Sequence, residues 1–220
     1  MLLSMNVIEL FSSIDGEGKR QGFLTTFLRL HDCNIRCSYC DTLYSYGPES
    51  TFESMSVQAV ADVIEQLENH RITVTGGEPL LQEPAIIELI DELTRRNARY
   101  DFNIETNGTI IPSFHRDNVW FTYDYKTPSS LAEDAMNLDI FKVATPADII
   151  KFVVGSMQDL DRMDEILKTY PTEAQIFVSP VWGNIEGATI VDYMKAHDWQ
   201  NVRFQLQIHK FIWDPDAKGV

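Results

Sequence analysis

The sequence has few cysteines, few basic residues and no long hydrophobic run. It contains only three cysteines in 220 residues, and this odd number argues against a framework of paired disulfides. Its 18 basic residues face 33 acidic ones, and a net charge of −15 repels phosphate backbones, so no nucleic-acid partner is expected. The apolar run at 149–154 is short and interrupted by Lys151, so no stretch is long enough for a membrane span.

The length and the N-terminus indicate one intracellular domain. A chain of 220 residues can bury a sizeable core as a single α/β domain spanning 1–220. Its first segment has no basic residue and carries Glu9 early, which is not typical of a signal peptide. We therefore expect a soluble, cytoplasmic protein with reduced thiols.

The three cysteines form one short motif. Cys33, Cys37 and Cys40 lie within eight residues as C-x3-C-x2-C. Three thiolates can hold three irons of a [4Fe–4S] cluster, which usually has four cysteine ligands. Without a fourth cysteine, one iron stays open to a small molecule that chelates through an amine and a carboxylate. The alternative is a zinc site with His31 as fourth ligand, although structural zinc sites more often consist of two separated ligand pairs.

Strands and helices are predicted to alternate along the chain. Ser56 is a predicted N-cap, Pro84 suits the first turn of a helix, and Ser156 with Asp159 is typical of a capping box. Repeated βα units predict parallel strands, and about six units favour a partial (β/α)6-type barrel with its site at the carboxyl ends of the strands. The predicted strands are 25–30, 71–75, 100–105, 119–123, 149–154, 175–178 and 202–208, and a late helix is expected near 185–196.

Three polar motifs stand at predicted strand ends. The segment 75–79 reads TGGEP, and 105–108 reads ETNG; each in isolation could be an ordinary turn. The segment 40–42 reads CDT, and the hydroxyl of Thr42 beside a substrate carboxylate could form part of a magnesium site, since Mg²⁺ prefers oxygen ligands.

Further segments complete a family pattern. They read SIDGEG at 13–18, DYK at 124–126 and QIHK at 207–210, with Arg29 near the end of a strand. Together with the motifs above, residues 11–209 resemble the 7-carboxy-7-deazaguanine synthase family of radical S-adenosylmethionine (SAM) enzymes. The resemblance implies a carbon–nitrogen lyase of queuosine-type biosynthesis, which converts 6-carboxy-5,6,7,8-tetrahydropterin to 7-carboxy-7-deazaguanine with loss of ammonia.

The resemblance also implies a set of site residues. Cys33, Cys37 and Cys40 would hold the cluster in a loop at 31–42, SAM would chelate the open iron, and Thr42 would contribute to Mg²⁺. The residues expected at the SAM site are Tyr39, Asp41, Gly77, Asp124, Tyr125, Lys126, Ser179, Pro180, Val181 and Trp182. Those expected at the pterin are Ile14, Asp15, Gly16, Glu17, Arg29, Thr75 and His209, with Glu105 and Asn107 as added candidates.

Two of these roles follow from chemistry as well. The planar fork of Arg29 can grip the substrate carboxylate, and His209 can assist it. Many family members carry Gln where this chain has Asp15, and the tail beyond His209 is longer than in members whose terminal carboxylate reaches the substrate. Whether Val220 does so here is left open.

Two alternatives belong to other classes of protein. A glycyl-radical activase would share the cysteine motif and GGEP but would act on a large protein, and SIDGEG and QIHK argue against it. A zinc-stabilised binding module would leave TGGEP and ETNG unexplained. For the synthase we expect an electron donor such as a flavodoxin, and a homodimer.

Overall fold

A single mixed sheet of nine strands organises the part of the chain that the computed structural model describes, residues 3–215 and 217–220. Its order is β3-β1-β2-β4-β5-β6-β7-β8-β9, and all neighbours from β2 to β9 are parallel, whereas β1 is antiparallel to both β2 and β3. The strands are β1 (Ser4–Ile14), β2 (Leu24–Leu30), β3 (Glu53–Ser56), β4 (Arg71–Gly76), β5 (Asp101–Thr106), β6 (Val119–Lys126), β7 (Ile149–Val154), β8 (Gln175–Pro180) and β9 (Val202–Phe204).

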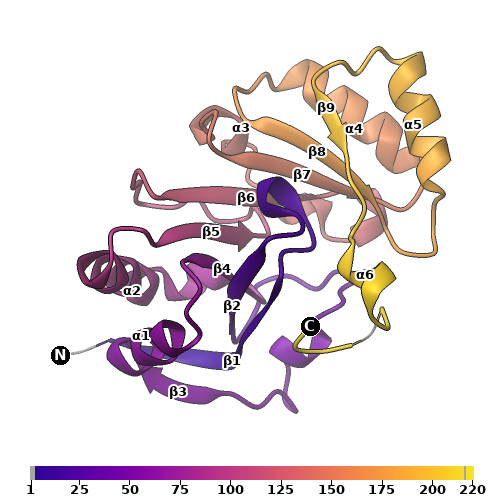
Figure 1. The fold of residues 1–220 in the computed structure, drawn as a ribbon. Coiled ribbons are helices and arrows are strands. Elements are labelled where there is room, and N and C mark those ends of the chain that lie inside the picture. The colour runs from indigo at the N-terminus through magenta and orange to yellow at the C-terminus, as the bar shows by residue number, and fades with distance from the viewer. Residues whose placement is uncertain (1–2, 216) are drawn as a thin grey trace.

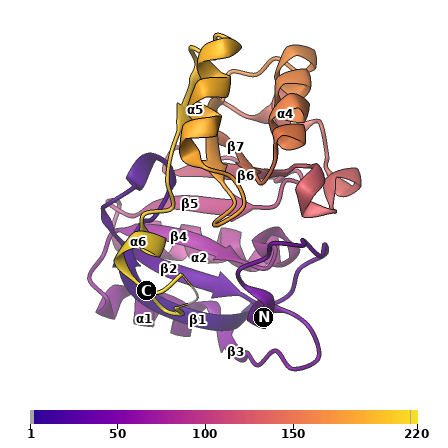
Figure 2. The same ribbon diagram turned by 90° about the vertical axis from the view of Figure 1, so that its right-hand side faces the viewer.

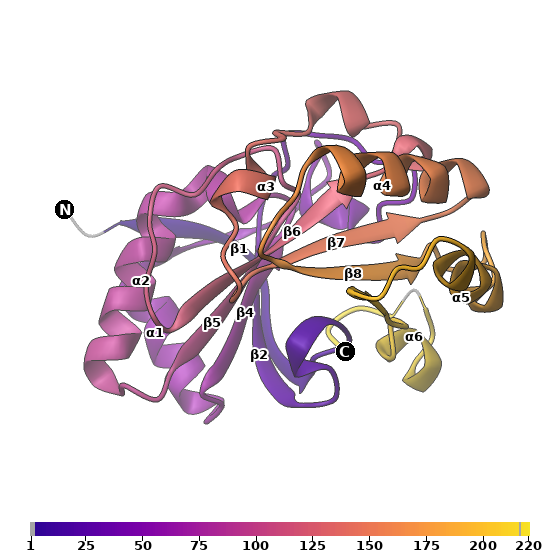
Figure 3. The same cartoon turned by 90° about the horizontal axis from the view of Figure 1, so that it is seen from above.

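The helices and the C-terminal segment lie on different sides of the curved sheet. Seen from above, α1 to α4 follow one face, while the β1–β2 turn and α6 lie on the other (Figure 3). The C-terminus lies beside α6 (Figures 1 and 2). None of the helices among the described residues is long and apolar enough to cross a membrane. The helices are α1 (Val57–Gln66), α2 (Glu83–Arg96), α3 (Ile140–Val143), α4 (Met157–Thr169), α5 (Gly187–Ala196) and α6 (His209–Ile212), with short 3₁₀ turns η1 (Gly18–Arg20), η2 (Leu43–Ser45), η3 (Pro79–Gln82), η4 (Pro128–Ser130) and η5 (Glu133–Ala135).

Strand alternation gives the sheet one apolar and one charged face. Side chains of successive residues point to opposite faces of a strand. In β6, Tyr123 and Tyr125 belong to the hydrophobic core, and the Tyr125 ring lies 5.0 Å from that of Phe152 in β7. The intervening Asp124 forms an ion pair with Lys151 of β7, 3.4 Å away on the opposite face. The helices thus cover the aromatic face, and the charges face the concave side.

The predicted α/β partial barrel is confirmed, with corrections at both ends of the sheet. Ser56 caps α1, accepting a hydrogen bond from the Ala59 amide. Strands β1 and β3 were not predicted at all. The last strand ends at Phe204 rather than at residue 208, because the next residues bind the β1–β2 turn: Gln205 Oε1 accepts from the Gly18 amide at 2.8 Å.

The predicted capping box of α4 is only half right. Ser156 Oγ accepts from the Asp159 amide at 3.2 Å, as expected. The carboxylate of the fully buried Asp159 accepts instead from the amides of Gly155 (2.7 Å) and Ser129 (2.8 Å). It therefore joins the β7–α4 connection to the turn that follows β6.

Asp159→Ala should lower the free energy of unfolding by about 1–3 kcal/mol, because it leaves two amide donors without their acceptor. Urea unfolding followed by circular dichroism would measure this. The control is Asp192→Ala on α5, where the aspartate side chain is 75% exposed and its loss should cost about 0.5 kcal/mol or less. Equal effects of the two substitutions would contradict the role assigned to Asp159.

Candidate active site

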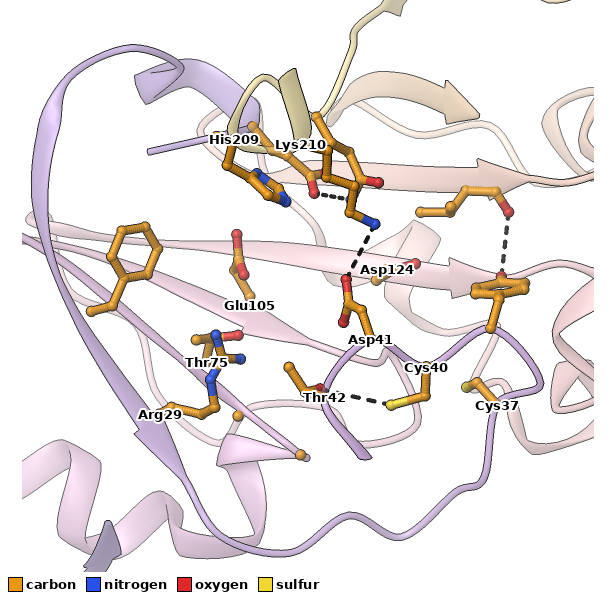
Figure 4. A pocket seen from close by; sticks show the side chains of 18 of the residues that line it. Arg29, Cys37, Cys40, Asp41, Thr42, Thr75, Glu105, Asp124, His209 and Lys210 are labelled. Carbon is orange, nitrogen blue, oxygen red and sulfur yellow. Dashed lines mark hydrogen bonds and ion pairs between the residues drawn. The ribbon is translucent and has the colours of Figure 1, made fainter. Parts of the chain in front are cut away.

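One cavity at the carboxyl ends of the parallel strands collects most of the predicted site residues. Arg29, Thr75 and Glu105 lie toward one side of it, and Cys37 and Cys40 lie toward the other (Figure 4). The predicted residues that line it are Ile14, Asp15, Gly16, Glu17, Arg29, Cys33, Cys37, Tyr39, Cys40, Asp41, Thr42, Thr75, Gly77, Glu105, Asn107, Asp124, Lys126, Val181, Trp182 and His209. The chain end, Val220, lines the same cavity.

Three predicted residues do not line the cavity. The Tyr125 hydroxyl donates to Glu133 at 2.9 Å, and its ring packs among core aromatics on the helix side, so its side chain cannot meet a ligand in the cavity. Pro180 also lies outside the lining. Ser179 is fully buried, and its hydroxyl has no hydrogen-bond partner within the described part of the chain.

The three thiols are free, half-buried and turned to one cavity. Burial raises the pKa of Cys37 to about 11, although nearby Lys126 opposes this. Within residues 3–215 and 217–220, no three His, Cys, Asp or Glu side chains converge where a single metal ion could sit. The thiolates of an iron–sulfur cluster bind separate irons and need not converge, so this donor set fits a cluster with one open iron.

The TGGEP segment packs tightly against the cysteine loop. A Cβ at Gly77 would lie 1.9 Å from the Asp32 carbonyl oxygen and 2.9 Å from the Cys33 Cβ, so only glycine fits there. Behind it, the fully buried carboxylate of Glu78 accepts from the Asn107 amide at 2.7 Å and from the Thr106 hydroxyl at 2.9 Å. Glu78 thereby fixes the ETNG segment beside the cysteines.

Asn107 continues this connection to the cluster loop. Its side-chain amide lies 3.7 Å from Cys33 Sγ and donates to Asn34 Oδ1 at 2.9 Å. The sequence motifs TGGEP, ETNG and C-x3-C-x2-C are therefore parts of one hydrogen-bonded unit.

A buried lysine that sequence reasoning treated only as an interruption is central to the charged side. Lys151 Nζ lies 2.9 Å from Glu17 and 3.4 Å from Asp124, which also pairs with Lys126 at 3.1 Å. Burial alone would raise the pKa of Glu17, but Lys151 and a hydrogen bond from Gln207 hold it at about 2. A charged residue inside an apolar strand was the signal that could have identified Lys151.

Two other carboxyl groups of the cavity have raised pKa values, in contrast to Glu17. Burial raises the pKa of Asp15 to about 6, although the Glu17 amide and Thr73 donate hydrogen bonds to it. Burial likewise raises the pKa of Glu105 to about 7 against the attraction of Lys151. These two groups therefore keep a proton to a higher pH than ordinary carboxyl groups do, whereas Glu17 is ionised well below neutral pH.

Arg29 and His209 approach the cavity from opposite ends of the chain. Arg29 Nε forms an ion pair with Glu9 Oε1 at 2.6 Å, and Tyr44 donates to the same oxygen at 2.7 Å. Sequence reasoning missed both partners. A Cβ at Gly16 would lie 2.0 Å from His209 Nδ1, so the glycine lets the histidine pack on the β1–β2 turn.

Asp15→Asn should make the protein more stable at pH 8 and change little at pH 4. The raised pKa means that ionisation of Asp15 opposes folding, so this cost grows as the pH rises from about 4 through about 6. Asparagine removes the charge at every pH. Thermal melts of the cluster-free protein across this range would measure the effect, with the exposed Asp117→Asn as control. A variant that is less stable than wild type at pH 8 would contradict the expectation.

The chain is similar to known proteins in both sequence and fold. Residues 29–153 match the family model of the radical SAM superfamily. The chain is 38% identical to a 7-carboxy-7-deazaguanine synthase of Clostridium acetobutylicum, covering 99% of this chain and 100% of that protein. It is 36% identical to the synthase of Leptospira interrogans, covering 99% of each. The crystal structure of QueE from Escherichia coli has the same fold, with a TM-score of 0.70 at 22% identity over 92% of this chain and 93% of that one.

Proposed function

The chain belongs to the radical SAM superfamily and, within it, to the 7-carboxy-7-deazaguanine synthase family, and from this we propose that it converts 6-carboxy-5,6,7,8-tetrahydropterin to 7-carboxy-7-deazaguanine with loss of ammonia. It is a radical SAM enzyme that uses a [4Fe–4S] cluster and SAM, acts on a small molecule and needs a reductant. The observation that carries the proposal is one cavity that joins three free thiols to a pocket of paired charges.

The cysteine side of the cavity suits the cluster and SAM. Cys33, Cys37 and Cys40 would hold the cluster, which when bound supplies the electron that cleaves SAM. Gly77, where only glycine fits beside the cluster loop, lines the same side of the cavity and would contact SAM. The SAM site would be completed by Tyr39, Asp41, Asp124, Lys126, Val181 and Trp182, which line the cavity.

Ser179 would join the SAM site through its hydroxyl. It lies level with Val153 in the β7–β8 register, and Val153 lines the cavity. A buried hydroxyl without a partner is unfavourable, and a hydrogen bond to a ligand would satisfy it. Tyr125 and Pro180 lie outside the cavity lining, and the proposed site does not use their side chains.

The charged side suits a carboxylated pterin. Arg29 would bind the substrate carboxylate with His209 assisting, because an unpaired buried carboxylate is strongly unfavourable. Glu17, ionised at neutral pH, would accept hydrogen bonds from the guanidine-like edge of the ring. The remaining pterin contacts would come from Ile14, Asp15, Gly16, Thr75, Glu105 and Asn107.

Several finer assignments rest mainly on the family. Thr42, which lines the cavity with its hydroxyl 3.7 Å from Cys40 Sγ, would give an oxygen ligand to Mg²⁺. The electron donor would be a flavodoxin, the protein would be a homodimer, and the oxygen-sensitive cluster suits a cytoplasmic location. The charged pocket and the near full-length match to synthases argue against a glycyl-radical activase.

Turnover is the direct test of the proposal. Protein reconstituted without oxygen and chemically reduced should convert the pterin in the presence of SAM, with the deazapurine detected by mass spectrometry. Cys37→Ala should abolish both SAM cleavage and product, because the chain offers only three thiols. Ser38→Ala, which removes an exposed hydroxyl bound to the Ser129 carbonyl oxygen, is the control in the same loop and should stay active. Full activity of Cys37→Ala, or no product from wild type, would refute the assignment.

Arg29→Lys should weaken pterin binding and leave SAM binding nearly unchanged. Lysine keeps the charge but loses the two-pronged geometry, and the loss of one charge-assisted hydrogen bond costs about 1.5–3 kcal/mol, or roughly ten- to hundredfold in affinity. Equilibrium titrations of each ligand would measure this, with the exposed Arg99→Lys as control. Equal pterin affinity in wild type and Arg29→Lys would show that another group binds the carboxylate.

A further inference from the structure

We propose that Glu9 is a positioning residue that orients Arg29 toward the substrate carboxylate; this role rests on the proposed function. Glu9 lies directly opposite Arg29 in the antiparallel β1–β2 register. Arg29 Nε is 2.6 Å from Glu9 Oε1, and the two side chains are only 16% and 20% exposed. The ion pair is therefore set by the strand pairing and shielded from solvent, unlike a loose surface pair.

The Glu9 carboxylate is itself held in place by the segment after the cluster loop. Tyr44 in η2 donates its hydroxyl to Glu9 Oε1 at 2.7 Å, so one oxygen accepts from both the tyrosine and the arginine. The C-terminal residues lie beside this pair: Lys218 Nζ lies 4.2 Å from the centroid of the Tyr44 ring, and a Cβ at Gly219 would lie 3.9 Å from Glu9 Oε2. The carboxylate is thus held by η2 as well as by β2, with the C-terminal residues beside it.

The geometry of guanidinium explains why such a partner matters. Its five N–H donors lie in one plane, so a carboxylate bound at Nε fixes the plane and with it the direction of the terminal N–H groups. Arg29 lines the cavity, and it can form a two-pronged bond to a substrate carboxylate only if its terminal N–H groups point into the cavity. Asp41 also attracts Arg29, but it lies 3.6 Å from Lys210. The acidic partner that fixes the orientation of the Arg29 guanidinium is therefore Glu9.

This arrangement also connects the two sides of the cavity. Tyr44 follows Thr42 and the last cysteine by a few residues, whereas Glu9 and Arg29 belong to the β1–β2 hairpin. The shared Glu9 oxygen therefore fixes the carboxylate-binding arginine relative to the cluster loop. Correct placement of the substrate's reacting carbon relative to SAM depends on such distances.

The test compares ligands with and without the carboxylate. Dissociation constants for 6-carboxytetrahydropterin and for unsubstituted tetrahydropterin would be measured on reconstituted protein with SAM present. Glu9→Ala should weaken binding of the carboxylated pterin about tenfold and leave the unsubstituted pterin and SAM nearly unchanged. Glu9→Gln should recover most of the affinity, because its amide oxygen still accepts from Arg29 Nε and from the Tyr44 hydroxyl. Glu53→Ala on β3, an exposed position, is the matched control.

The possible outcomes separate Glu9 from the proposed function. Tighter binding by Glu9→Ala would show that Glu9 competes with the substrate for Arg29, and an equal loss for both pterins would show a packing role; either result overturns the proposal. No change in Glu9→Ala, with a wild type that binds and turns over the pterin, would overturn the Glu9 role alone. A wild type that binds neither pterin would overturn the proposed function and the Glu9 role together.

Discussion

The ion pair of Lys151 with Glu17 is the interaction on which the charged half of the cavity depends. Glu17, Asp124 and Glu105 all act on this one ammonium group, whose side chain is only 9% exposed. Uncompensated charges are very costly to bury, so the lysine allows these acidic groups to be enclosed together. It also fixes the β1–β2 turn, since Glu17 lies in that turn and Lys151 lies in the middle of the sheet. The ion pair thus joins the first hairpin to the strand ends and closes one wall of the cavity.

Strand alternation makes this possible without weakening the core. Within β7, Ile150, Phe152 and Val154 belong to the hydrophobic core, while Lys151 points the other way. Burial of apolar side chains stabilises the fold by about 25 cal/mol per Å² of area removed from water, and that gain supports a cavity whose charges are balanced mainly by one another. A shift of one residue in register would exchange the two faces, so the apolar packing of the helices also fixes the position of every charged group.

Local sequence patterns predicted most of this structure, and contacts between distant segments account for what was missed. Short β-branched and aromatic runs predicted the parallel strands, and the polar motifs that follow them predicted the cysteine side of the cavity. Strand β1 was missed because its pairing with β2 and β3 is set by partners elsewhere in the chain. For the same reason Glu9 and Tyr44 could not be identified: the register that places Glu9 opposite Arg29 exists only once the hairpin forms. Tyr125 lies outside the cavity lining for a local reason, since neighbours on a strand face opposite sides.

The spread of carboxyl pKa values suggests how the pocket divides the hydrogen bonds of a pterin. Glu17, with a pKa of about 2, is an ionised acceptor. Its oxygens already accept hydrogen bonds from Lys151 (2.9 Å), Gln207 (2.5 Å) and Gln205 (3.4 Å). An ionised carboxylate offers about four lone-pair sites, so a donor from the ring would take the remaining one or replace the long Gln205 bond. Asp15 and Glu105, with pKa values of about 6 and 7, can instead donate a hydrogen bond to a ring nitrogen or carbonyl while they are protonated. A carboxyl at position 15 can donate only while it is protonated, and it is burial that extends that range toward neutral pH.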